Sequence, residues 1–139
     1  MDGLSHLGAA LAALAGPWQI AYALGATLAG IMIGLLPGLS ATLGVALFTT
    51  LTLKMQPADA ILVLICVYVG AIYGGSRTAI LLNIPGTAAN AAACLDGNML
   101  ARQGQAGRAM GIATTGSVAG SLFGVVCLAM FTPLLAETA

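Results

Sequence analysis

The feature that most constrains this chain is the length of its uncharged runs. Between His6 and Lys54 lie 47 consecutive residues without a formal charge, and the segments 60–76, 78–95 and 109–136 add runs of 17, 18 and 28 residues. A helix needs about 20 residues to cross the hydrocarbon core of a bilayer. Because a soluble core has no use for so many such runs, the sequence predicts an integral membrane protein.

The fold class predicted is an all-α integral membrane protein with several transmembrane helices. A β-barrel would need segments of about ten residues that alternate apolar and polar side chains, whereas these runs are apolar all round and rich in Ala, Leu and Gly. The formal net charge is zero and the basic residues are scattered, which gives no sign of a nucleic-acid partner. We expect an N-terminal segment over 1–16 and a transmembrane unit over 17–139. The first six residues contain no Lys or Arg, which argues against a cleaved signal peptide.

No catalytic or metal-binding constellation can be drawn from the chain, so we expect neither an enzyme nor a metal site. The single histidine, His6, is terminal, and the sequence contains no Walker loop and no zinc-protease motif. Cys66, Cys94 and Cys127 lie in or beside apolar runs without a Cys-x-x-Cys spacing, and we expect them to be packing residues.

Prolines and glycines divide the chain into helical segments. Pro17 and Trp18 are typical of a helix start at a membrane interface, and the helix they open should run to Leu36, about 30 Å. The 15 residues 39–53 are short for an independent span. Residues 54–59 should form a polar turn, and 60–73 a further apolar helix. Length alone leaves open whether the breaks between segments lie at the interface or at mid-depth.

The last part of the chain contains one polar segment and one long apolar segment. Residues 96–108 form the most polar part, which should be a solvated loop facing water or headgroups and containing Asp96, Arg102 and Arg108. Residues 109–136 can span a membrane with tilt to spare. Gly116, Gly120 and Gly124 should share one face of that helix, a pattern that allows close packing of another helix.

Three breaks follow one pattern, in which a glycine-containing breaker is followed within two residues by Ser or Thr, a preferred N-cap. The stretches are "LPGLSATLG" with Ser40, "YGGSRTAIL" with Ser76 and "NIPGTAANA" with Thr87. They predict three helix N-termini in or at the edge of the membrane. Such ends carry unpaired N–H groups and a positive partial charge, and they can bind an anion, as in secondary transporters with broken helices. The alternative is that they are ordinary interfacial loops.

Two polar residues near these breaks have two interpretations each. Asn83 could contact a substrate or cation, or it could cap the broken backbone. Arg77 could pair with a carboxylate, or its head could reach back to an interface. If each breaker is a hairpin turn, Lys54, Arg102 and Arg108 share the N-terminal side and only Arg77 lies elsewhere, which favours a cytoplasmic N-terminus.

Two stretches resemble the large permease subunit of tripartite tricarboxylate transporters, the TctA family. They are "GIMIGLLPGLSATLG" (30–44) and "YGGSRTAILLNIPGTAANAAACLDGNMLARQGQAGRAMGIA" (73–113). The resemblance implies a binding-protein-dependent secondary transporter of the bacterial inner membrane. Its partners would be a small four-helix membrane subunit and a periplasmic solute-binding protein. Its substrates would be citrate, other di- and tricarboxylates or related organic anions, taken up with an ion gradient (Na⁺ or H⁺) and without a cofactor.

The breaks and the resemblance together supply the candidate substrate-binding residues. Backbone and hydroxyl groups at Ser40, Ser76 and Thr87 would donate to substrate carboxylates, and Asn83 would be an amide contact, while glycine and proline set the geometry. The full set is Pro37, Gly38, Leu39, Ser40, Gly74, Gly75, Ser76, Asn83, Pro85, Gly86 and Thr87.

The chain departs from the family's pattern in two respects. The usual subunit is several times longer and has two related halves, so this chain resembles only the opening part of the first half and by itself should not transport. Family members commonly have an aromatic–proline pair after "DG", where this chain has Asn98–Met99. A non-transporting assembly module and a channel-type pore are the alternative functions.

Overall fold

The computed structural model describes Gly8 and residues 16–136. The elements are α2 (Pro17–Leu35), α3 (Ala41–Thr52), α4 (Pro57–Leu82), η1 (Ala88–Asn90), α5 (Ala91–Leu100), η2 (Ala101–Gln105) and α6 (Ala106–Ala136). This part of the chain contains helices and no strand, which confirms the predicted all-α class. Most of the expected N-terminal segment, 1–16, lies outside the described residues.

Three helical stretches are long and apolar enough to cross a membrane. They are Pro17–Leu35, Pro57–Leu82 and Ala88–Thr132, the last of which includes η1, α5, η2 and most of α6. Helix α3, with 12 residues, is about 18 Å long and too short to span a bilayer. The described chain therefore has the composition and helix lengths of a multi-pass membrane protein.

The first two helices begin and end where the sequence predicts. Pro17 opens α2, and the side chain of Trp18 beside it is 72% exposed. A tight turn follows α2, closed by a hydrogen bond of 3.2 Å from the Leu39 N–H to the Leu36 carbonyl. Gly38 in this turn has φ +90°, which glycine adopts without strain. Ser40 then caps α3 by accepting a hydrogen bond of 3.3 Å from the Leu43 N–H, as predicted.

The predicted second break does not exist, because α4 continues without interruption from Pro57 to Leu82. Gly74 and Gly75 are buried within this helix, and the Ser76 hydroxyl donates 2.7 Å back to the Tyr73 carbonyl instead of capping a new helix. The physical reason lies in packing: a Cβ on Gly74 would collide with the Ile31 carbonyl of α2. These glycines let two helices approach closely, which is a common use of glycine in membrane helices.

Helices α2 and α4 pack side by side in the same direction. Gly70 approaches Thr27, and four residues later Gly74 approaches Ile31, while Gly30 lies against the backbone of Val67. Each contact is so close that a Cβ would collide with backbone atoms. Helix α3 runs back in the opposite direction beside this pair and packs mainly on α4. The small core of this bundle contains Ala26, Val63 and Val67.

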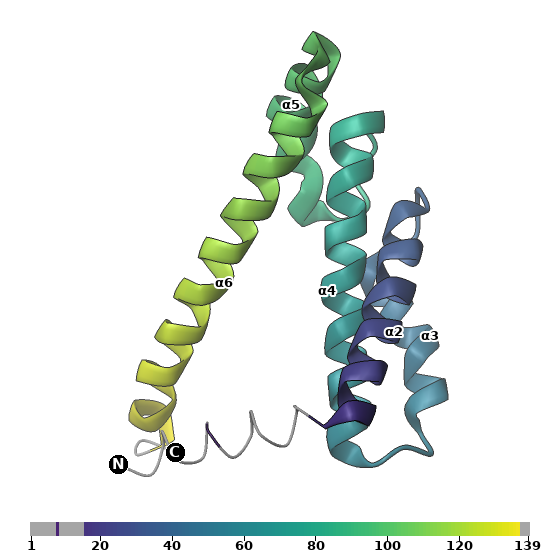
Figure 1. Cartoon of the computed structure of the whole chain (residues 1–139), viewed down its shortest axis with the longest axis vertical. Coiled ribbons are helices and arrows are strands. Elements are labelled where there is room, and N and C mark those ends of the chain that lie inside the picture. The colour runs from purple at the N-terminus through teal and green to yellow at the C-terminus, as the bar shows by residue number, and fades with distance from the viewer. Residues whose placement is uncertain (1–7, 9–15, 137–139) are drawn as a thin grey trace.

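The second half of the described chain is a long helical hairpin beside α4 (Figure 1). Two side-chain hydrogen bonds, from Asn90 to the Ile72 carbonyl and from Asn98 to the Ile80 carbonyl, each join residues 18 apart. The equal separation shows that α5 runs parallel to α4. The chain reverses at η2, where Gly104 has φ +80°, and α6 then diverges from α4 toward the other end of the molecule.

This topology changes where the basic residues lie. Arg77 bonds to Met110 on α6, two residues beyond Arg108, and Arg102 bonds to Asn98 beside Ile80. Arg77, Arg102 and Arg108 therefore lie toward the C-terminal end of α4, and Lys54 lies at the opposite end, in the loop before α4. The hairpin arrangement from which a cytoplasmic N-terminus was predicted is wrong, because the turn assumed at Gly74–Ser76 is absent.

Candidate functional site

Three glycines from three segments meet at the point where α2 ends. A Cβ on Gly86, in the loop after α4, would lie 2.9 Å from the Cα of Gly75 and 3.3 Å from the Gly34 carbonyl oxygen of α2. A Cβ on Gly75 would lie 2.7 Å from the Asn90 side-chain nitrogen. The structure thus brings the "YGGS" and "NIPG" motifs together through backbone contact, with no space for side chains between them.

Asn83 ends α4 in the left-handed conformation, with φ 59° and ψ 28°. Its backbone N–H and that of Ile84 both donate to the Thr78 carbonyl, which satisfies an orphan carbonyl at the end of the helix. The Asn83 side chain is exposed. Of the two interpretations of Asn83, the structure supports the capping of the helix end, and a substrate contact stays a prediction.

Thr87 precedes the short helix η1, at the position where an N-cap was predicted. Its side chain makes no capping hydrogen bond, and its Oγ1 atom is buried without a partner among the described residues. A buried hydroxyl without a partner costs free energy and invites a ligand or water. Thr87 is therefore the candidate residue with the clearest unmet hydrogen-bonding capacity.

The candidates of the first break lie at the surface of the described chain. Pro37 and Gly38 are exposed, and Leu39 and Ser40 are half-buried. The Ser40 hydroxyl also lies 2.6 Å from the Thr42 hydroxyl, so it is already engaged by its own helix. Pro85 is exposed as well. Two of the three predicted helix N-termini are present, those after Ser40 and Thr87.

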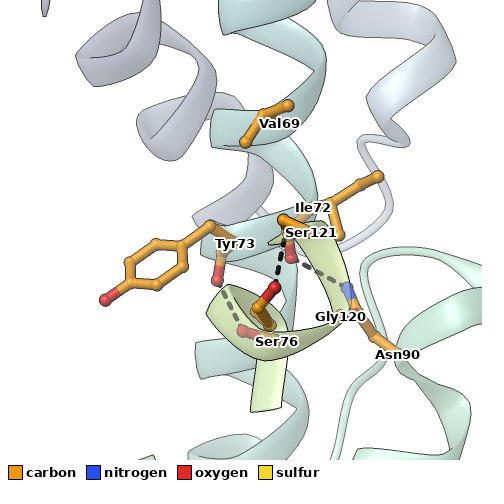
Figure 2. A pocket seen from close by; sticks show the side chains of 8 residues that line it. Val69, Ile72, Tyr73, Ser76, Asn90, Gly120 and Ser121 are labelled. Carbon is orange, nitrogen blue, oxygen red and sulfur yellow. Dashed lines mark hydrogen bonds between the residues drawn. The ribbon is translucent and has the colours of Figure 1, made fainter. Parts of the chain in front are cut away.

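A cleft of about 430 Å³ opens between α4, η1 and α6 (Figure 2). Its lining is mostly apolar, with hydroxyl and amide groups from all three elements. The residues are Val69, Ile72, Tyr73, Ser76, Asn90, Ser117, Gly120 and Ser121. Ser76 is the one predicted site residue that lies in this cleft.

Arg77 links α4 to α6 next to the cleft, one helical turn beyond Tyr73, and is not one of its lining residues. Its guanidinium donates 3.3 Å to the Met110 carbonyl and 2.6 Å to the Thr114 hydroxyl, and it lies 4.0 Å from the centre of the Tyr73 ring. Tyr73 also lines the cleft. The guanidinium head therefore does not reach away to an interface but is held half-buried against a neighbouring helix.

The sequence analysis missed two buried asparagines that hold α5 against α4. Asn90 donates 3.2 Å to the Ile72 carbonyl, and Asn98 donates 2.9 Å to the Ile80 carbonyl and accepts 2.9 Å from Arg102. Asp96, Arg102 and Arg108 are exposed as predicted, but the loop predicted there is wrong, since most of residues 96–108 are helical. The eight-residue spacing of Asn90 and Asn98 was visible in the sequence, although nothing in the sequence indicated that either side chain has a partner on α4.

Three features of the described structure now bear on the identity of the chain: its apolar helices, its Pro-Gly breaks and the contact between its "YGGS" and "NIPG" motifs. Over residues 20–139 the chain matches the family described as the tripartite tricarboxylate transporter TctA family. It is also 35% identical, over all of its length, to an uncharacterised 52.8 kDa protein in the TAR-I ttuC' 3' region of Agrobacterium vitis. The chain spans 28% of that relative's length. No solved structure matches the chain. The chain belongs to the tripartite tricarboxylate transporter TctA family.

Proposed function

We propose that this chain is the N-terminal part of a large permease subunit that takes up tricarboxylates or related organic anions. The observation that carries the proposal is the family match over residues 20–139. The three stretches able to cross a membrane support it, since a permease must be a multi-pass protein. Because the chain spans 28% of its relative, transport is proposed for the longer protein that contains this part.

The transporter would be a secondary transporter of the bacterial inner membrane that depends on a periplasmic binding protein. Its second membrane partner would be a small four-helix subunit, and an Na⁺ or H⁺ gradient would drive uptake without a cofactor. Helix ends that interrupt apolar segments are typical of secondary transporters, where they contact anionic substrates and coupling ions. The breaks at Pro37–Gly38 and Pro85–Gly86 supply two such helix ends here.

Within this function, we assign substrate contacts first to the two breaks. Thr87 carries the strongest support, because its Oγ1 is buried and lacks a partner in the described structure. The helix start after Ser40 offers the N–H groups of Ala41 and Thr42, which a capped helix leaves unpaired. Pro37, Gly38, Leu39, Pro85 and Gly86 would shape these ends, and Asn83 would contribute its exposed amide. Gly74 and Gly75 act as packing residues in this proposal.

Uptake of labelled citrate tests the function. The full-length subunit, reconstituted with its small membrane subunit and supplied with the binding protein, should accumulate citrate against its gradient. Accumulation should disappear when an ionophore collapses the Na⁺ or H⁺ gradient or when the binding protein is omitted. Citrate that equilibrates without either requirement would indicate a channel, and the absence of uptake of any di- or tricarboxylate would indicate an assembly module.

A further inference from the structure

One charged group, Arg77, lies one helical turn beyond Tyr73 at the end of the cleft between α4 and α6, outside its lining residues. Its charge is not neutralised by the contacts that hold it. Arg77 lies in α4, inside the candidate span Pro57–Leu82. Both of its hydrogen-bond acceptors, the Met110 carbonyl and the Thr114 hydroxyl, are neutral. A cation in a membrane span is costly, and such residues usually mark a substrate or ion pathway.

The guanidinium retains donors for a ligand. An arginine has five N–H donors in a planar fork, and two of them are used by Met110 and Thr114. The Tyr73 ring lies under the guanidinium plane, at 4.0 Å, and this stacking fixes its orientation. An arginine held in this way is preorganised to accept a planar carboxylate through two parallel hydrogen bonds.

The neighbouring hydroxyls are poorer candidates for an anion. The hydroxyls of Ser76, Ser117 and Ser121 each donate to a carbonyl of their own helix, at 2.7, 2.8 and 2.8 Å. Their protons are therefore already donated within the helices and are not free for an anion in the cleft. The positive charge at the end of the cleft is the group best able to bind a carboxylate there.

The cleft and Arg77 belong to one continuous surface. On α6, Met110, Thr114, Ser117 and Ser121 are spaced by four, three and four residues, so they share the helix face that is turned to α4. On α4, Tyr73 lines the cleft and also stacks on Arg77. A ligand in the cleft would thus have its anionic end at Arg77 and its remaining part between Ile72 and the glycine-serine face of α6.

We propose that Arg77 binds a carboxylate of the transported substrate in the cleft between α4 and α6. This assignment rests on the proposed function, since it names the charge contact within a carboxylate permease. The substrate contacts proposed above lie at the helix ends after Pro37–Gly38 and Pro85–Gly86. Arg77 adds a substrate contact within the uninterrupted helix α4.

The test measures the KM and kcat of citrate uptake by the reconstituted full-length transporter. Arg77→Gln removes the charge and should raise KM by about tenfold or more, since a charge-assisted hydrogen bond is lost. Arg77→Lys keeps a point charge without the planar fork and should raise KM by a smaller factor. A KM equal to that of the wild type in the Arg77→Lys and Arg77→Gln variants would overturn the proposal, and Arg77→Lys alone decides it if the other variant does not fold.

Two control variants separate binding from a merely structural role. Thr114→Val removes one of the two groups that hold the guanidinium but keeps its charge, so KM should rise less than in Arg77→Gln if the guanidinium acts on the substrate. An increase in KM as large as that of Arg77→Gln would show that the link between helices matters, and would overturn the proposal. Lys54→Gln removes a cation at the opposite end of α4 and should leave KM unchanged.

The outcomes also distinguish this proposal from the function on which it rests. Normal citrate uptake by the wild type with unchanged KM in the Arg77 variants refutes only the role of Arg77. Absence of saturable uptake of citrate and of any other di- or tricarboxylate by the wild type refutes both.

Discussion

At the scale of single residues, the glycines of the "YGGS" and "NIPG" motifs are best explained by contact distance. Gly104 and Gly38 have positive φ angles and serve turns, but Gly75 and Gly86 do not. They are needed because their Cα atoms meet at a crossing of three segments, where a single methyl group has no space. A residue that looks like a helix breaker can therefore be a packing residue inside an unbroken helix.

We expect Gly75→Ala to destabilise the protein by about 1–3 kcal/mol, the usual cost of overpacking. The new Cβ would lie 2.7 Å from the Asn90 side-chain nitrogen and 3.3 Å from the Gly86 Cα. Gly107→Ala is the matched control, since nothing lies within 4 Å of its Cβ position, and it should be neutral or slightly stabilising. Thermal unfolding of the full-length subunit in detergent measures both. Equal melting temperatures for the two variants would contradict the packing role.

At the scale of helices, local sequence patterns predicted the ends of elements better than their continuity. Pro17 and Ser40 mark helix starts as predicted, and the apolar length of α2 was correct. Helix α4 starts at Pro57, inside the polar turn predicted over 54–59. The break at Gly74–Ser76 was wrong because its explanation lies on α2, about forty residues earlier in the chain. Asn90 and Asn98 were missed for the same reason, since their partners are carbonyls of α4. The part of the candidate site that lies at helix ends was thus predicted from local chemistry. The contacts between helices were not, because they depend on how far one helix is shifted along its neighbour.

Asn98 should be the stronger of the two links between α5 and α4. It is buried, donates to the Ile80 carbonyl and accepts from Arg102, so Asn98→Ala leaves an arginine without its acceptor. We expect a loss of about 1–3 kcal/mol in the free energy of unfolding. Hydrogen exchange should show faster exchange confined to α5 and the η2 turn. Gln103→Ala, in the exposed part of the same turn, is the control, and an equal effect of both variants would count against the link.

At the scale of the whole molecule, the parallel course of α2, α4 and α5 sets the distribution of charge. Arg77, Arg102 and Arg108 gather toward one end of the described bundle, and Lys54 lies at the other. Cytoplasmic ends of membrane helices carry an excess of Lys and Arg. In this topology Arg102 and Arg108 lie at the end opposite the start of α2, and Lys54 lies at the same end as that start, so the distribution of basic residues outside the spans favours the opposite orientation.

We predict that the α5–α6 turn faces the cytoplasm and that the α3–α4 loop faces the periplasm. Single cysteines at Gln103 and Gln56 test this in the full-length protein, after Cys66, Cys94 and Cys127 have been replaced by alanine. A membrane-impermeant maleimide applied to intact cells should label the Gln56→Cys protein, and label the Gln103→Cys protein only after the cells are opened. The reverse pattern of labelling would contradict this prediction and would support a cytoplasmic N-terminus.

The parallel pairing of α2 with α4 also has a consequence for biogenesis. As the chain is synthesised, α2 enters the bilayer first, and its close-packing face, with Gly30 and Gly34, has no partner at that time. Its partner face on α4 becomes available only after α3 has reversed the chain and residues up to Gly74 have been made. The close contact between α2 and α4 can therefore form only after α4 has been made, and α2 and α3 precede the partner that completes their packing.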